Sequence, residues 1–253
     1  MKSNIESDCL TFGESYEFPG HSLLLIKAGH VGCDIRINSR DKEERLCIEM
    51  HEGGMLVLTP CMLTLEMGNL FYTMLDLPHL SKLQVFIDKA QSNKKEPHNA
   101  TYGYLPADLS MQPTTREIEY FFLNQSLTNA DSIKSFSEAL RNNEWYDLVE
   151  FLLDESCESS TQRISTLSLR YGLSVSHFRR LARQALGNTT KVEMRDWRLV
   201  RAILDLIESK NNNLTTIALK HGYASLSHFS NEVKEEFGVS PRKLKNLHMR
   251  DDS

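Results

Sequence analysis

A group of basic and small polar side chains near residue 180 has the chemistry to contact nucleic acid. Arg179, Arg180 and Arg183 follow the pair Ser176-His177 directly. An arginine guanidinium can donate two parallel hydrogen bonds to guanine O6 and N7, or it can bind a phosphate. A serine hydroxyl can bond to phosphate or to a base edge. These residue types favour a DNA-binding surface, although the same arginines could also form an ordinary solvated helix face.

The pattern around this group occurs a second time in the chain. Residues 167–173 match residues 217–223 at an offset of 50, and Ser176-His177-Phe178 matches Ser227-His228-Phe229 at an offset of 51. The sequence therefore contains an internal repeat with one residue inserted between its two matching parts.

Each copy of the repeat has the residue order of a helix-turn-helix. A short helix ends at Gly172 or Gly222, because glycine readily adopts positive φ. A turn of three or four residues follows, and a second helix begins at a serine N-cap. The second helix of each copy has apolar positions that we expect to face inward, namely Phe178, Leu181, Ala185, Phe229, Val233 and Phe237. Its opposite face is then free to enter a major groove.

The segment between the two copies is predicted to be one continuous helix over residues 192–208. Its apolar positions are Trp197, Val200, Ile203, Leu204 and Ile207. A rigid helix fixes the distance and the angle between the second helices of the two copies. Two such helices about one turn of DNA apart can enter successive major grooves. The pattern thus indicates a DNA-binding module rather than a generic helical bundle.

Charge is distributed unevenly along the chain. The formal net charge is −5, which by itself argues against a nucleic-acid partner. Residues 1–160, however, hold 13 basic and 25 acidic residues, whereas residues 161–250 hold 16 basic and 7 acidic residues. Local positive charge favours DNA because it displaces condensed counterions. We therefore expect the last part of the chain to bind double-stranded DNA and the acidic first part to stay away from it.

In these residues the chain resembles the AraC/XylS family of transcription regulators. The similarity covers residues 161–245 and includes Gly172-Leu173-Ser174, Arg180, Arg198, Ala202, Ile217-Ala218, Gly222-Tyr223, Ser227, Phe229 and Gly238-Val239-Ser240-Pro241. Within the family, residues 221–230 and 240–244 are most similar to the activators of invasion-type type III secretion systems, the InvF and MxiE group. The resemblance implies a transcription activator, in contact with RNA polymerase, that serves secretion or virulence genes.

The resemblance also implies which residues read the DNA grooves. The family's groove-reading positions fall at Ser176, Arg179 and Arg180 in the first copy and at Ser227, His228 and Asn231 in the second. Together with neighbouring polar side chains, the candidate DNA-binding residues are Ser174, Ser176, His177, Arg179, Arg180, Arg183, Ser225, Ser227, His228 and Asn231.

The second copy departs from the family pattern. The family commonly has arginine where this chain has Asn231, and the same helix carries Glu232, Glu235 and Glu236. We therefore expect the second copy to read bases weakly and the first to supply most of the affinity.

The chain as a whole is predicted to have an α+β fold. Residues 1–114 form a β-rich, cupin-like regulatory domain with antiparallel strands from about residue 10 to residue 87 and a loop over 92–114. Residues 115–160 form a helical dimerisation or linker region, and residues 161–250 form the all-α domain with two helix-turn-helix units. The cupin-like layout follows the family resemblance.

The helical region is expected to contain helices over 116–127 and 131–155, with an interruption near Asn142-Asn143. Phe121, Phe122, Phe136 and Leu140 give these helices more apolar surface than a solvated connector needs. The helices either pack within their own domain or form the surface of a homodimer or of a protein co-activator.

Enzyme chemistry finds little support in the sequence. A metal-dependent cupin needs clustered histidines and a glutamate, and His21, His30, His51 and Glu49 are present without a His-x-His pair. Phosphate-binding Gly-rich loops and G-x-S-x-G elbows do not occur. The five cysteines are scattered, as in a cytoplasmic protein with reduced thiols. We expect no enzyme activity, no cofactor, no metal, no secretion signal and no membrane span.

Two kinds of effector remain open for the first domain. A small molecule such as a sugar needs aromatic platforms and several polar side chains, whereas the strand interior here is mainly Leu, Ile, Val, Met and Cys. This composition favours control by a protein, and the resemblance implies a secretion chaperone that acts as co-activator. The alternative is a regulator of metabolic genes that binds a small ligand inside the barrel.

Overall fold

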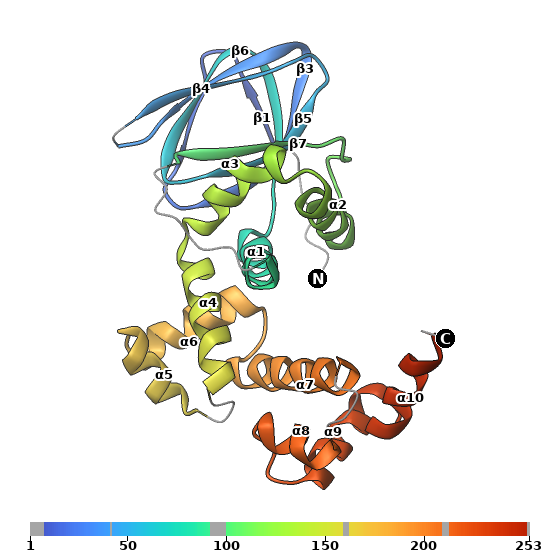
Figure 1. Cartoon of the computed structure of the whole chain (residues 1–253). Coiled ribbons are helices and arrows are strands. Elements are labelled where there is room, and N and C mark those ends of the chain that lie inside the picture. Colours follow the sequence, from blue (N-terminus) through green and yellow to red (C-terminus); the bar gives the residue numbers. More distant parts are fainter. Residues whose placement is uncertain (1–7, 41, 92–99, 159–161, 209–212, 252–253) are drawn as a thin grey trace. The chain divides into compact units, whose positions relative to one another are not determined.

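The computed structural model describes residues 8–40, 42–91, 100–158, 162–208 and 213–251 (Figure 1). The chain divides into two compact units, Met1–Asp147 and Leu148–Ser253. The predicted functional boundaries after residues 114 and 160 stay predictions.

A seven-stranded antiparallel sheet forms the centre of the first unit. Its strands run in the order β1-β6-β3-β5-β7, while β2 pairs with β6 and β4 pairs with β3. The strands are β1 (Asp8–Thr11), β2 (Ser15–Phe18), β3 (Ser22–Asn38), β4 (Glu43–Ile48), β5 (Gly53–Leu58), β6 (Cys61–Met74) and β7 (Tyr102–Pro106). The predicted antiparallel β domain is thus confirmed.

The long strands β3 and β6 pair along most of their length and change register between Ala28 and Cys33. Gly68 lies at this irregularity with φ of 80°, and an added Cβ there would overlap the carbonyl oxygen of Gly32. Glycine is required at such a close approach because a side chain would push the two strands apart.

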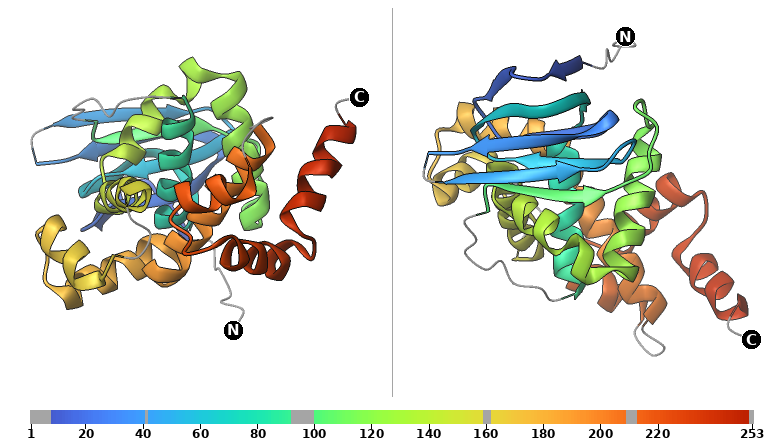
Figure 2. Two further views of the ribbon diagram at one scale, coloured as in Figure 1. Left: turned by 60° about the horizontal axis from the view of Figure 1, so that its bottom comes forward. Right: turned by 90° about the horizontal axis from the view of Figure 1, so that it is seen from above.

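Both faces of the sheet are covered, which explains the uninterrupted apolar run at the start of β3. Leu24 and Ile26 point into a core made only of strand residues and the tyrosines of β7. Leu23 and Leu25 point to the opposite face, where three helices pack. These helices are α1 (Leu77–Gln91), α2 (Thr115–Thr128) and α3 (Ala130–Arg141), and Figures 1 and 2 show them gathered on one side of the sheet. A strand buried on two faces has no polar alternation.

Two sequence predictions for this unit were wrong. The strand-rich region was predicted to continue to residue 87, but residues 77–91 form α1, whose buried Leu77, Leu80 and Val85 follow helical spacing. The predicted loop over 92–114 contains β7, which pairs with β5. Gly103 of β7 packs directly against the backbone of α3, where any Cβ would clash. Residues 92–99 lie outside the described part.

The apolar side chains of the helical region pack within their own domain. Phe122, Phe136 and Leu140 are fully buried against the sheet, and Phe121 is half-buried in the same cluster. The surface that we predicted from these four residues therefore does not exist as an exposed patch, and the intramolecular alternative is correct for them. The exposed apolar residues of α2 are instead Tyr120, Leu123 and Leu127.

The predicted helix break at Asn142-Asn143 is confirmed. α3 ends at Arg141 and α4 (Glu144–Glu158) begins two residues after Asn142. The Asn143 side chain accepts the backbone N–H of Tyr146 at 2.9 Å, as an N-cap does. The buried carboxylate of Asp88 on α1 receives two hydrogen bonds from Arg141, at 2.6 and 2.7 Å, and one from the Tyr146 hydroxyl at 2.8 Å.

Of the histidines that could suggest a cupin metal site, two lie side by side. The rings of His30 and His51 meet edge to face with centroids 4.9 Å apart. Among the described residues, no three His, Cys, Asp or Glu side chains are grouped in a way that could hold a metal ion. Among the helices that the structure describes, we find none with the length and apolar content needed to span a bilayer.

The second unit is helical throughout its described part (Figure 1). Beyond α4 it contains α5 (Ile164–Tyr171), α6 (Val175–Leu186), α7 (Thr190–Glu208), α8 (Leu214–Lys220), α9 (Leu226–Phe237) and α10 (Pro241–Asp251). The predicted α+β fold, with an antiparallel β domain before an all-α domain, is confirmed.

Candidate nucleic-acid interface

The first helix-turn-helix consists of α5 and α6. Gly172 ends α5 with φ of 84°, in the left-handed region that favours glycine. Ser174 begins α6 as its N-cap, because its hydroxyl accepts the backbone N–H of His177 at 3.3 Å. Phe178 and Leu181 are buried, while the arginines of the opposite face are exposed, namely Arg179, Arg180 and Arg183. The turn and the inward face are as predicted.

Side-chain contacts hold the first helix-turn-helix to the end of α4. Arg170 of α5 donates to the buried carboxylate of Glu155 at 2.5 Å, and the Gln162 amide donates to the same oxygen at 2.9 Å. The ring of Tyr171 lies 5.0 Å from Phe151 and 5.8 Å from Phe178, between centroids. The last turns of α4 therefore belong to the packing of the first helix-turn-helix.

The second helix-turn-helix consists of α8 and α9. Ser225 is the N-cap of α9, and its hydroxyl accepts the N–H of His228 at 3.2 Å. Phe229 and Val233 are buried as predicted. Phe237, which we expected to face inward, is 43% exposed. It is the last residue of the helix before the left-handed Gly238, so it lies past the last turn that packs on the unit's core.

Glu232 is the main departure from the sequence analysis. We counted it among three acids of this helix that weaken base reading, but its side chain is only 10% exposed and accepts a hydrogen bond from Arg198 of α7 at 3.1 Å. The guanidinium of Arg198 also lies 4.3 Å from the ring centroid of Tyr223. Burial raises the pKa of Tyr223 to about 12, so its phenol stays neutral. Glu232 is three residues after the buried Phe229, a spacing that indicates the inward side.

The linking helix α7 is continuous over Thr190–Glu208, as predicted. At roughly 1.5 Å per residue it is about 28 Å long. Trp197 and Ile203 are buried, whereas Val200 and Leu204, which we grouped with them, are about half exposed. Near its end, Asp205 accepts hydrogen bonds from the side chains of two residues at the end of α8, Lys220 at 2.7 Å and His221 at 2.9 Å.

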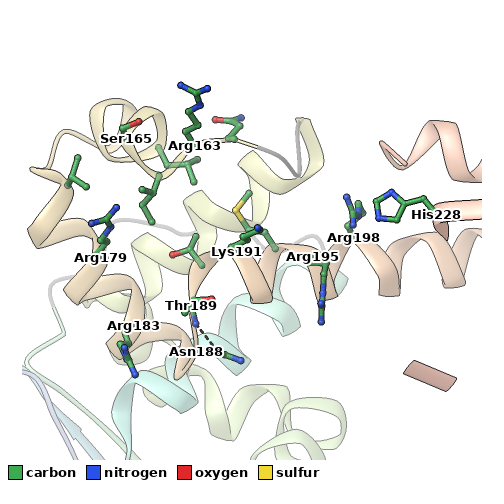
Figure 3. Close-up of a pocket in the computed structure, with 16 residues that line it drawn as sticks. Arg163, Ser165, Arg179, Arg183, Asn188, Thr189, Lys191, Arg195, Arg198 and His228 are labelled. Atoms are coloured by element: carbon green, nitrogen blue, oxygen red, sulfur yellow. Dashed lines mark hydrogen bonds between the residues drawn. The ribbon is translucent and has the colours of Figure 1, made fainter. Parts of the chain in front are cut away.

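A hollow of about 1070 Å³ lies against α5, α6 and the first half of α7, with His228 of α9 at its edge (Figure 3). Arg179 and Arg183 of α6 line one side, Lys191 and Arg195 of α7 lie in the middle, and His228 of α9 lies at the other side. Residues 162–190, which include α5 and α6, contain five basic and no acidic residues. The hollow is therefore bordered by positive charge from α6 and α7.

The structure separates the predicted DNA-binding residues into three groups. Arg179, Arg183 and His228 line the hollow. Ser176, Arg180, Ser227 and Asn231 are exposed elsewhere on α6 and α9, and His177 is half-buried. Ser174 and Ser225 use their hydroxyls as caps, so they set the starts of α6 and α9.

Sequence reasoning missed the two cations on the first half of α7. Lys191 and Arg195 are four residues apart and therefore share one face of the helix. Both are exposed, and Arg195 hydrogen-bonds the neighbouring carboxylate of Asp196 at 3.1 and 3.2 Å. The signal was present as a basic pair at the start of a helix predicted only as a spacer.

Comparison with known proteins agrees with this geometry. Residues 167–246 match the model of a helix-turn-helix domain family. The invasion protein InvF of Salmonella typhimurium is 37% identical over 216 residues, which cover 83% of this chain and 96% of InvF. The chain belongs to the AraC-type family of helix-turn-helix transcription regulators. This AraC-type chain is also 39% identical to the transcriptional regulator MxiE of Shigella flexneri over 127 residues, 50% of this chain and 57% of MxiE.

Among solved structures, ToxT from Vibrio cholerae O395 aligns over 96% of this AraC-type chain and 95% of ToxT, with 13% identity and a TM-score of 0.38. The AraC-type regulator from Chromobacterium violaceum aligns over 38% of this chain and 91% of its own, with 23% identity and a TM-score of 0.33.

Proposed function

We propose that this AraC-type DNA-binding regulator activates type III secretion or other virulence genes from the cytoplasm, in contact with RNA polymerase. The observation that supports the proposal is the extent of the similarity to InvF. The helix-turn-helix match covers residues 167–246, whereas the similarity to InvF extends over 216 residues and so includes most of the sheet-containing unit, Met1–Asp147. A similarity limited to the DNA-binding half would carry no information about the genes controlled, because that half is common to regulators of many pathways.

In this proposal, α6 makes most of the contacts with base edges. Arg179 and Arg180 are exposed on the face opposite the buried Phe178, and each has the fork of donors that fits guanine O6 and N7. Arg183 is one turn further along and is assigned to phosphate. Ser176 and His177 of α6 complete the first contact set, while Ser227, His228 and Asn231 of α9 form the second and weaker one. Ser174 and Ser225 act by fixing the starts of these helices.

A protein co-activator such as a secretion chaperone is the effector that we propose for the sheet-containing unit, Met1–Asp147. The strand core contains Leu24, Ile26 and Ile35 among other aliphatic side chains that are almost completely buried. Aliphatic packing of this density offers few polar groups to a sugar-like ligand. We assign any homodimer contact to the same unit, since its acidic surface is unsuited to DNA.

The proposal is tested by mapping where the full-length chain binds the chromosome of its own bacterium and which transcripts it raises. Binding at secretion-gene promoters, with transcription in a purified system that rises when a secretion chaperone from the same bacterium is added, is the expected result. The double variant Arg179→Ala, Arg180→Ala should lose both, while Lys134→Ala, an exposed cation of α3, should keep both. Promoters of metabolic genes that respond to a small molecule would instead support the alternative regulator.

A further inference from the structure

We propose that the linking helix α7 binds DNA itself, with Lys191 and Arg195 holding the phosphate backbone between the two grooves that α6 and α9 enter. The inference rests on the DNA-binding part of the proposed function and extends it to a helix that otherwise serves as a spacer. The occupant to which it commits is the sugar-phosphate backbone of duplex DNA.

Lys191 and Arg195 lie where a bound duplex would pass. Lys191 and Arg195 line the hollow whose other sides are formed by Arg179 and Arg183 of α6 and by His228 of α9 (Figure 3). A duplex that contacts α6 and α9 together must pass across this hollow. Side chains in the middle of the hollow then face whatever part of the duplex lies between the two contacts.

The dimensions of α7 decide which part of the duplex that is. The helix is about 28 Å long at roughly 1.5 Å per residue, and successive major grooves on one face of DNA are about 34 Å apart. Between two major grooves lie a minor groove and the phosphates at its edges. Lys191 and Arg195 are on the first two turns of α7, so they face the backbone that borders the groove which α6 enters. The phosphates of this backbone carry negative charge and no base information.

The charges around the hollow fit this occupant. Arg198 is unsuited to the role because it is 8% exposed and bonded to Glu232. Lys191 and Arg195 are both exposed on one face of α7, at the end where helix amides add positive potential. Among the residues that line the hollow are several cations and no carboxylate. Arg195 lies 3.1 Å from the carboxylate of Asp196 and 3.7 Å from that of Glu232, so the test begins with Lys191.

The apolar part of the lining is consistent with sugar contacts. Met194 of α7, Ile164 of α5 and Val175 of α6 line the same hollow. Deoxyribose presents carbon and hydrogen atoms beside each phosphate, so a lining of aliphatic side chains with cations between them matches the alternating chemistry of the backbone.

The test measures how the affinity of the full-length chain for DNA depends on salt. Anisotropy titrations between about 50 and 200 mM salt give the slope of log K against log salt, whose size is about 0.9 for each phosphate that the protein neutralises. We expect Lys191→Gln to make the slope shallower by about 0.9 and the double variant with Arg195→Gln by about 1.8. The affinity should fall equally on a selected site and on unrelated duplex, because phosphate contacts are independent of sequence.

Two controls separate a backbone contact from a structural role. Lys191→Arg keeps the charge and should keep the slope, and Lys134→Gln, which removes an exposed cation of α3, should change nothing. A Lys191→Gln slope equal to that of the unmodified chain overturns the inference, as does weaker binding with an unchanged slope. A wrong assignment of target genes looks different, since the chain would then occupy other promoters while the slopes still decide the role of α7.

Discussion

The two helix-turn-helix units share one backbone plan but use their charges differently. In both, a left-handed glycine and a serine N-cap fix the turn, and a buried phenylalanine anchors the second helix. Residues 162–190 contain five basic and no acidic residues, whereas residues 213–240 contain two basic and three acidic ones. The turn and the core specify the fold, so the outer face of each unit is free to diverge in function.

A buried glutamate bonded to an arginine is found in each unit, and its origin differs. In the first helix-turn-helix, Glu155 comes from α4 and binds Arg170 of α5, and α6 itself contains no acidic residue. In the second unit Glu232 is part of α9 itself and binds Arg198 of α7. The second helix-turn-helix therefore uses a residue of its own second helix for internal packing, and α9 retains fewer exposed positions.

The largest effect that we expect concerns these two ion pairs. Arg198→Met should lower the free energy of unfolding of the second helix-turn-helix by about 3 kcal/mol, because it removes the hydrogen-bonded partner of the buried Glu232 carboxylate and leaves Arg195 only at 3.7 Å. Arg170→Met should cost under about 1 kcal/mol, since Arg170 is 45% exposed and Gln162 still donates to Glu155. Hydrogen exchange of the α9 and α5 amides measures the two values, and equal losses would remove the contrast between the units.

The sequence alone predicted those features of the two helix-turn-helix units that depend on neighbouring residues. Gly172, Ser174 and the apolar spacing of α6 predicted the first unit correctly, because a turn and an amphipathic helix depend on neighbouring residues. The Glu232–Arg198 pair joins residues 34 positions apart, so no local pattern revealed it. The hollow is likewise formed by four helices, α5, α6, α7 and α9, and only the packed structure brings Lys191 to face it. For the same reason Phe122 was ambiguous until its contacts with the sheet were known.

A smaller effect concerns the reading of bases. Arg180→Ala should weaken binding to a selected DNA site by about 1–3 kcal/mol and relax the preference at one base position, because it removes a bidentate contact. Asn231→Ala should cost less, as a short amide has less reach. Competition titrations with single-base variants of the site measure both quantities. The reverse order would make the second unit the main reader.

The smallest effect concerns the acids that remain exposed on α9. Glu235→Gln combined with Glu236→Gln should raise the affinity for DNA a few-fold at low salt, because two carboxylates no longer repel nearby phosphates. The gain should vanish as salt rises, since exposed charges are screened. Glu138→Gln with Glu144→Gln makes the same charge change within Met1–Asp147, away from both helix-turn-helix units in the sequence, and a similar gain from that pair would show a general charge effect.

The most direct test of the contrast compares two triple variants of the full-length chain on the same duplex. One replaces Arg179, Arg180 and Arg183 by alanine, and the other replaces Ser227, His228 and Asn231. The account predicts a loss of roughly 100-fold or more for the α6 variant, with a salt slope shallower by up to about 2.7. It predicts a loss below about ten-fold for the α9 variant. An equal or larger loss from the α9 variant would contradict the account.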